Sequence, residues 1–192
     1  MYKRQEKGDT IAVIGPSGSG KSTLFKQLNN LISPTEGELY LDGKNYNDYS
    51  PEELRSRVSY LMQQSGLIGS TIEHNMKFPC EARGDKFDKE KAKQLIKQVG
   101  LGDYDLDAEI EHMSGGERQR ITIARQLMYE PEVLLLDEST SALDTKNKEN
   151  IENIIFDFAK KGVAILWITH SDDQSMSCLL YTSDAADERS SV

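Results

Sequence analysis

Four short apolar runs recur along the chain, and each has the length of a β-strand. Thr10–Ile14 is rich in β-branched residues, and Val58–Met62, Val133–Leu136 and Val163–Thr169 are the other three. The run Val133–Leu136 is apolar at every position, which is typical of a strand buried on both faces of a parallel sheet. The pattern therefore predicts an α/β fold with a mainly parallel sheet.

Helical periodicity appears between and after these runs. A stripe at i, i+3, i+4 and i+7, formed by Ile151, Ile154, Ile155 and Phe158, predicts a helix that packs this face on the core. A second helical stretch is expected at 23–30, directly after a glycine-rich segment. The apolar runs are all far too short to cross a bilayer.

The glycine-rich segment joins the first predicted strand to the first predicted helix, and it has the pattern G-x-x-x-x-G-K-S. Glycines suit this place because backbone N–H groups can then wrap a phosphate, and the helix adds its positive end. We expect Lys21 to reach the β- and γ-phosphates of a nucleotide and Ser22 to coordinate Mg²⁺. The candidate nucleotide-binding residues here are Gly15, Pro16, Ser17, Gly18, Ser19, Gly20, Lys21, Ser22 and Thr23.

Two acids follow the apolar run Val133–Leu136. Asp137 stands at the end of the predicted strand, where ligands of parallel sheets bind, and we expect it to hold hydrated Mg²⁺. Glu138 comes one residue later and is expected to polarise the attacking water as the catalytic base. These two acids turn a phosphate-binding loop into a candidate hydrolytic site.

A third motif lies shortly before these acids. Ser114, Gly115, Gly116 and Glu117 precede a helical stretch, and small residues at a helix start form a second nest for an anion. In order and spacing the three motifs resemble the ABC ATPase family, whose signature is written LSGGQ. Met113 replaces the usual Leu, and Glu117 replaces Gln.

The resemblance implies roles for further residues. The signature would face the γ-phosphate bound by a second copy, so that ATP lies between two subunits. Gln63, or the adjacent Gln64, would be the Q-loop glutamine, which binds the metal, takes part in catalysis and reports nucleotide to the membrane partner. Asp144 would belong to the loop that crosses the dimer interface, and His170 would be the catalytic switch histidine that contacts the γ-phosphate.

Within the family, the chain resembles the bacterial FetA-type ATPases, which are associated with iron export. The matching stretches are 31–35, 58–60, 77–79, 139–144 and 166–173. The resemblance implies a homodimeric ATPase that uses ATP and Mg²⁺, works with an integral-membrane permease and lies at the cytoplasmic face of the cell membrane. A non-transport ABC regulator and an inactive gene fragment are the alternatives. No long coiled coil interrupts the motifs, which favours the transporter class.

The amino-acid composition restricts the kind of protein and of partner. Hydrophobic residues make up 37% and charged residues 29%, as in a globular protein, and the net charge is -9. That charge disfavours nucleic acid as a partner, because phosphate backbones require Lys and Arg. Cys80 and Cys178 have no metal-ligand spacing.

Both ends of the chain have unusual sequences. Back-translation of residues 1–5 and of 178–192 is consistent with one DNA element read on opposite strands, and that element resembles a sequencing-library adapter. We expect a partial ABC nucleotide-binding domain at 6–177, with a small helical signature subdomain at about 70–128, that is truncated at both ends. The upstream aromatic residue that stacks on adenine in the family, the strands before Thr10 and those after His170 are expected to be missing.

Overall fold

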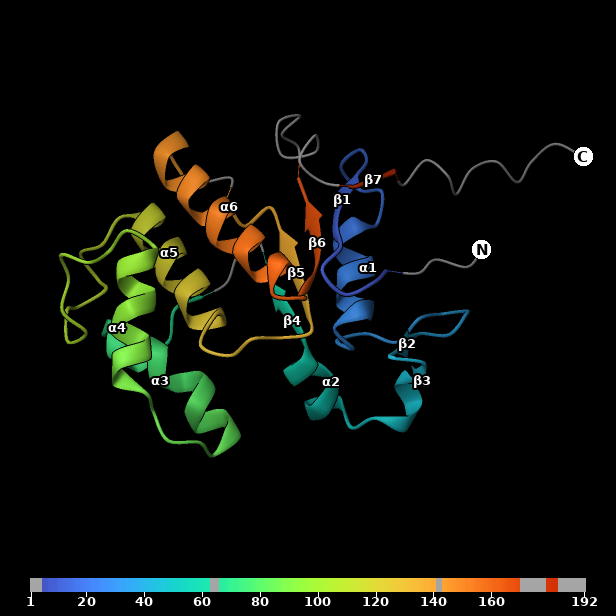
Figure 1. The fold of residues 1–192 in the computed structure, drawn as a ribbon, viewed down its shortest axis with the longest axis horizontal. Helices are drawn as coiled ribbons and strands as arrows, with labels where there is room; N and C mark the ends of the chain where they lie inside the picture. Colours follow the sequence, from blue (N-terminus) through green and yellow to red (C-terminus); the bar gives the residue numbers. More distant parts are fainter. Residues whose placement is uncertain (1–4, 63–65, 141–142, 170–178, 183–192) are drawn as a thin grey trace, which may run out of the picture. The chain divides into compact units, whose positions relative to one another are not determined.

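A computed structural model describes residues 5–62, 66–140, 143–169 and 179–182, the last by backbone alone. The chain divides into two compact units (Figure 1). The first comprises the chain up to Tyr60, 131–138 and the part from Ala159 onward, and the second comprises 61–130 and 139–158. The helical subdomain that we expected at about 70–128 falls within the second unit.

The first unit is built on a parallel sheet. Its strands are β1 (Thr10–Ile14), β4 (Val58–Leu61), β5 (Val133–Asp137), β6 (Ala164–Ile168) and β7 (Leu179–Thr182). Among the described residues their order is β4-β5-β6-β1-β7, and β6 pairs in parallel with both β1 and β5. The prediction of an α/β fold from the four apolar runs is confirmed.

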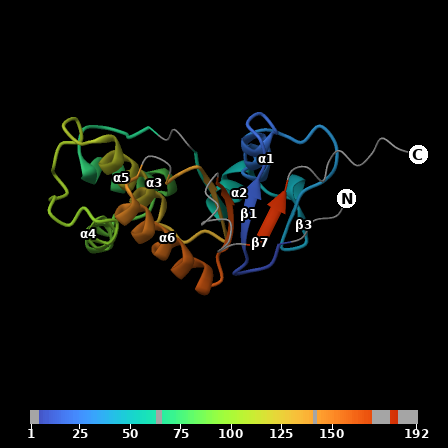
Figure 2. The ribbon, with the colours of Figure 1, turned by 90° about the horizontal axis from the view of Figure 1, so that it is seen from above.

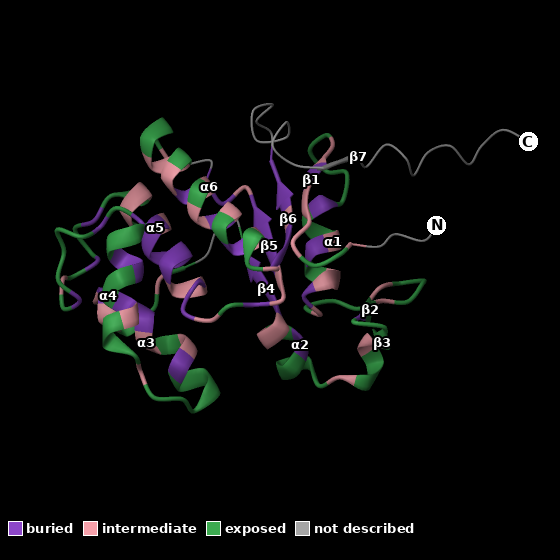
Figure 3. Cartoon of the chain, viewed as in Figure 1, coloured by how far each residue is buried: buried purple, intermediate pink, exposed green. Residues whose placement is uncertain are grey.

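The apolar runs of β4, β5 and β6 are buried at nearly every position (Figure 3). In β5, Leu134 to Leu136 are at most 1% exposed. On one face the phenyl ring of Phe25 meets the ring of Tyr60 edge-to-face, with centroids 6.0 Å apart. The core cluster around them consists of Val13, Phe25, Leu41, Leu54, Val58, Tyr60, Leu135 and Ile168.

Helix α1 (Lys21–Leu28) follows β1 and packs against β5. It begins two residues before the predicted stretch 23–30, so that Lys21 and Ser22 form part of its first turn. It ends earlier than predicted because Asn30 adopts a left-handed backbone, with φ at 56°.

A small hairpin precedes β4. It consists of β2 (Tyr40–Leu41) and β3 (Lys44–Asn45), and η1 (Tyr46–Asp48) and α2 (Pro51–Arg57) follow it. Ser50 caps α2 by accepting a hydrogen bond from the backbone N–H of Glu53, 3.1 Å away.

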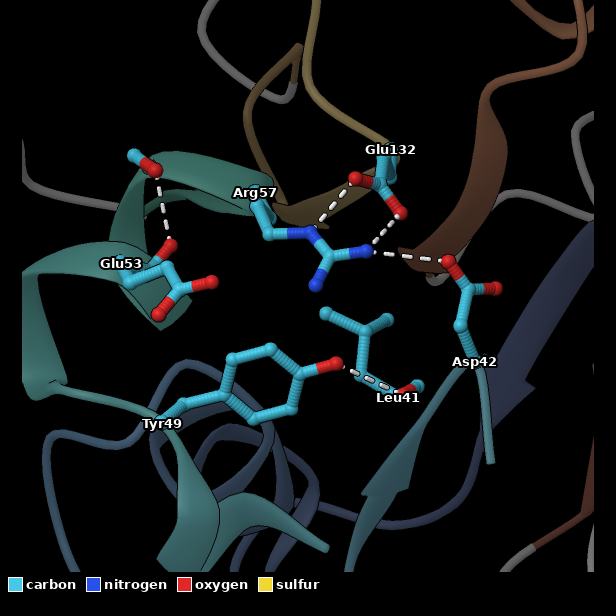
Figure 4. Close-up of polar contacts among 7 residues, drawn as sticks. Leu41, Asp42, Tyr49, Glu53, Arg57 and Glu132 are labelled. Carbon is cyan, nitrogen blue, oxygen red and sulfur yellow. Dashed lines mark hydrogen bonds and ion pairs between the residues drawn. The ribbon is translucent and has the colours of Figure 1, made fainter. Parts of the chain in front are cut away.

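Arg57 connects the end of α2 to the start of β5 (Figure 4). Its Nε lies 2.6 Å from Oε1 of Glu132, and its terminal nitrogen lies 2.9 Å from Oε2 of Glu132 and 3.0 Å from Oδ2 of Asp42. The guanidinium also lies over the ring of Tyr49, whose hydroxyl donates to the carbonyl of Leu41. This bidentate pair fixes the hairpin, α2 and the entry of β5 relative to one another.

Strand β7 corrects the expectation that no strand follows the last apolar run. Leu179–Thr182 pairs in parallel with β1, in the register Ile11 to Leu179 and Ile14 to Thr182, and lies beside it in Figure 2. Without a neighbour here, β1 would present unpaired N–H and C=O groups, and a segment of Leu, Tyr and Thr suits a strand. The adapter origin of residues 1–5 and 178–192 stays a prediction.

The second unit is helical. It contains α3 (Ile72–Arg83), α4 (Lys89–Gln98), α5 (Gly115–Gln126) and most of α6 (Thr145–Lys160). Both α3 and α4 pack on α5. In α6, Ile151, Ile155 and Phe158 are buried, so the predicted stripe is buried at three of its four positions.

Candidate nucleotide-binding site

The loop between β1 and α1 has the backbone of a phosphate cradle. Gly18 and Gly20 adopt positive φ angles of 81° and 87°, which β-substituted residues rarely tolerate. A Cβ at either glycine would meet no atom of the described residues within 4 Å, so this part of the chain leaves the space above the loop open. The first turn of α1 contains no acidic residue, and its positive end is left for a ligand.

Lys21 places its charge inside this loop. The side chain is only 8% exposed, and Nζ donates to the carbonyl of Gly15 at 2.8 Å and to that of Pro16 at 3.0 Å. Backbone carbonyls therefore hold the ammonium group at the loop. A nucleotide phosphate offers charged acceptors in place of these neutral ones, and such bonds are stronger.

The carboxyl ends of β1 and β5 lie at the same edge of the sheet. Val13 and Asp137 both pair with Ile168 of the strand between them, so they are level and roughly 10 Å apart across two strand spacings. The end of β1, which leads into the phosphate loop, and Asp137 at the end of β5 therefore lie at one edge, where ligands of parallel sheets bind.

Asp137 is buried, at 4% exposure, and accepts a hydrogen bond from the hydroxyl of Tyr60 in β4. The distance from the hydroxyl to Oδ2 is 2.8 Å. Burial raises the pKa of Tyr60 far above its usual value, and the hydrogen bond to Asp137 raises it further. The phenol therefore keeps its proton and remains a hydrogen-bond donor. Sequence reasoning passed over Tyr60, because 77 residues separate it from Asp137 and no local pattern marks the pair.

Glu138 has a strained backbone. Its φ is 49°, in the left-handed region, and its N–H donates to the carbonyl of Ile168 at 3.1 Å. A residue other than glycine pays about 1 kcal/mol for this conformation. Such strain is typical of functional positions, and here it turns the chain sharply at the end of β5, directly after Asp137.

The donor set suits Mg²⁺. This ion prefers oxygen ligands, and in nucleotide sites it takes one or two protein oxygens together with phosphates and waters. Asp137 supplies a carboxylate, and Ser22, which is exposed in the first turn of α1, supplies a hydroxyl. Gln63, the third predicted ligand, lies outside the described residues, as does His170.

The predicted signature forms the start of α5. Ser114 is the N-cap, and its Oγ accepts from the N–H of Glu117, while Glu117 accepts from the N–H of Ser114 at 2.8 Å. Both halves of a capping box are therefore present. Hydrogen bonds lower the pKa of Glu117. The largest contributions come from the hydroxyl and the backbone N–H of Ser114, and the hydroxyl of Tyr104 adds a smaller one.

Gly115 is the first residue of α5, is exposed and has no positive φ. A Cβ there would meet nothing within 4 Å. The described residues thus give no reason for a glycine here, although glycine weakens a helix relative to alanine. A glycine without an internal reason suits a surface that another molecule approaches closely.

Asp144 caps α6. Its Oδ1 accepts from the N–H of Asn147 at 3.1 Å, and its Oδ2 accepts from the Asn147 side chain at 2.6 Å. These bonds lower the pKa of Asp144. The structure therefore gives this residue a capping role, and its predicted place at a dimer interface stays a prediction.

A glycine-rich loop between a parallel strand and a helix, with an acid at the end of a neighbouring strand, defines the class of P-loop nucleotide-binding proteins. The family model for ABC transporters matches residues 4–141. The chain belongs to the ABC transporter family and is an ATP-binding, ATPase-type domain of it, as the order of its motifs predicted.

Three comparisons place it within the family. The chain is 41% identical over 168 residues to the "Probable iron export ATP-binding protein FetA" of Escherichia coli (strain K12), over 87% of this chain and 75% of FetA. It is 42% identical over 172 residues to "Methionine import ATP-binding protein MetN" of Staphylococcus haemolyticus (strain JCSC1435), over 86% of this chain and 50% of MetN. A solved bacterial Atm1-family ABC exporter with ATP bound superposes with a TM-score of 0.84 at 28% identity, over 93% of this chain and 32% of that one.

The chain thus spans three quarters of FetA but half or less of the other two proteins. No helix in the described part of the chain is long and apolar enough to cross a bilayer.

Proposed function

We propose that this chain is the motor subunit of an ABC exporter, which hydrolyses MgATP between two head-to-tail copies and couples closure to a membrane partner. The observation that carries the hydrolytic step is the end of β5, where Asp137 is buried against Tyr60 and Glu138 takes a left-handed backbone. Both stand at the sheet edge that carries the phosphate loop.

Each residue at that edge of the sheet has a separate role in the proposed reaction. The loop around Gly18 and Gly20 binds phosphate through backbone N–H groups, and Lys21 adds a positive charge. Asp137 and Ser22 hold Mg²⁺, which neutralises phosphate charge when it is bound. Glu138 orients the attacking water and accepts its proton as the bond to the γ-phosphate forms.

A second copy completes the site. The start of α5 offers the exposed Ser114 and the open backbone at Gly115, which suit a phosphate. We therefore assign the segment Ser114, Gly115, Gly116 and Glu117 to the nucleotide bound by the partner copy, with Asp144 beside it. In this segment Ser114 and the backbone of the two glycines contact the phosphate, and Glu117 holds Ser114. An isologous pair of this kind has two equivalent ATP sites.

Export, with iron as the cargo, is the finer part of the proposal. The likeness to FetA covers more of the relative's length than the likeness to MetN does, and the solved neighbour is also an exporter. The chain would then lie on the cytoplasmic face of the cell membrane, bound to a permease that selects the cargo.

Steady-state MgATP hydrolysis tests the hydrolytic part. The wild-type chain should hydrolyse ATP, and Glu138→Gln should lower the turnover rate at least about a hundredfold, which is the usual contribution of a general base. Glu52→Gln is the matched control, because that carboxylate is 81% exposed on α2. Equal turnover in the Glu138→Gln variant would contradict the assignment.

Co-expression with a permease encoded beside the gene tests the cargo. Cells with wild-type chain should hold less iron than cells with Glu138→Gln. Equal iron content would contradict iron export, and ATP-dependent control of another protein without transport would favour a regulatory ATPase.

A further inference from the structure

The hydroxyl hydrogen of Ser114 is already engaged within the chain. Ser114 Oγ donates to Oε2 of Glu117 at 2.7 Å, and the N–H of Ser114 donates to the same oxygen at 2.8 Å. In return Oγ accepts from the N–H of Glu117 at 3.3 Å. A hydroxyl has a single hydrogen, so in this arrangement it has none to offer to a phosphate.

The carboxylate that takes this hydrogen is itself held in place. The hydroxyl of Tyr104, from the loop between α4 and α5, donates to Oε1 of Glu117 at 2.8 Å. Both oxygens of Glu117 are therefore used, one by Ser114 and one by Tyr104. The carboxylate cannot turn away from Ser114 without losing the bond to Tyr104.

We propose that Glu117 is a positioning residue that competes with the γ-phosphate of ATP for the hydroxyl hydrogen of Ser114. The inference rests on the proposed function, in which Ser114 binds the nucleotide of a second copy. ATP then engages this signature only when Ser114 exchanges its bond to Glu117 for a bond to phosphate. Glu117 thereby weakens the response to ATP without contacting it.

A glutamine at this position weakens the competition. It keeps the size of the side chain, and its carbonyl can still cap the N–H of Ser114. The hydroxyl bond loses its charge assistance, because hydrogen bonds to ionised acceptors are roughly twice as strong as neutral ones. We expect Glu117→Gln to lower the KM for MgATP about fivefold and to change kcat by less than about twofold.

The test measures KM and kcat in the Glu117→Gln variant, with and without Ser114→Ala. If Glu117 acts through the hydroxyl, the fall in KM disappears in the Ser114→Ala background. A fall that persists there would overturn the competition, because only a general charge effect survives the loss of the hydroxyl. Affinity for ADP, which lacks the γ-phosphate, should stay unchanged in both variants.

The matched control is Glu111→Gln. Glu111 is an exposed carboxylate three residues before Ser114, so this change removes the same charge nearby. Its KM should equal that of the wild type, and a similar fall would overturn the proposal.

Failure of the inference and failure of the proposed function give different results. If the wild type hydrolyses ATP, Glu138→Gln stops turnover and Glu117→Gln leaves KM unchanged, only the inference is wrong. If the wild-type chain has no Glu138-dependent turnover, the proposed function is wrong and this inference fails with it.

Discussion

Gly115 begins α5 on an exposed surface, and the substitution Gly115→Asp adds a carboxylate to that surface. The added Cβ meets no atom of the described chain within 4 Å, so these residues need no rearrangement. An acid in the first turn of a helix also interacts favourably with the helix dipole. The change therefore leaves the fold intact, and it alters what can approach the start of α5.

The two expected effects have opposite signs. Replacing a helical glycine and adding an N-terminal acid together stabilise the fold by about 1 kcal/mol, which for a domain of this size raises Tm by about 2–4 °C. A phosphate charge about 4 Å from the new carboxylate is repelled by about 4 kcal/mol at an effective dielectric constant of about 20. That repulsion corresponds to a loss of several hundredfold in ATP engagement, since about 1.4 kcal/mol is tenfold.

Thermal unfolding and steady-state MgATP hydrolysis measure the two effects on one preparation. The expected variant is at least as stable as the wild type and has almost no turnover. Gly115→Ala is a control variant for Gly115→Asp, because it adds a methyl group without adding a charge. A stable Gly115→Asp variant with turnover within about threefold of the wild type would refute the idea that a phosphate approaches this surface.

Three further outcomes follow from the described contacts. Glu138→Gly relieves the left-handed strain and should raise the free energy of unfolding by about 1 kcal/mol, whereas Glu138→Gln should leave it unchanged. Denaturant titration checks both, and both variants should lose at least about a hundredfold in MgATP turnover. Tyr60→Phe removes the donor to buried Asp137, so stability should fall by about 1–3 kcal/mol and more Mg²⁺ should be needed for half-maximal turnover. Because hydrogen bonds lower the folded pKa of Glu117, its stabilising effect is present above the unfolded pKa of about 4.3 and is lost as pH falls through the folded pKa. The Tm difference between wild type and Glu117→Gln should therefore stay constant from pH 7 to about pH 5 and shrink as the pH falls below about 4.

The sheet could be predicted from the sequence because its strands are short, apolar and bounded by turn residues. Thr10–Ile14 matches β1 residue for residue, and the runs at 58–62 and 163–169 contain β4 and β6. Leu179–Thr182 was missed, because a four-residue edge strand has no periodicity of its own. Its pairing depends on the open edge of β1, which lies far away in the sequence.

The sequence could predict candidate site residues where a motif fixes the backbone locally, as in the phosphate loop and at Asp137. The sequence could not predict hydrogen bonds between site residues that lie far apart along the chain. Tyr60 reaches Asp137 across 77 residues and Tyr104 reaches Glu117 across 13, and no spacing rule links either pair. The left-handed backbone of Glu138 was also missed, because a glutamate in sequence gives no sign of a positive φ.

Mixing two inactive variants tests the central claim, that ATP is hydrolysed between the phosphate loop of one copy and the signature of another. Lys21→Ala keeps an intact signature, and Gly115→Asp keeps an intact phosphate loop. A mixed head-to-tail dimer then contains one complete site. Because half of the dimers are mixed and each has one working site of two, an equimolar mixture should recover about a quarter of wild-type turnover. A mixture that stays as inactive as its components would contradict the account.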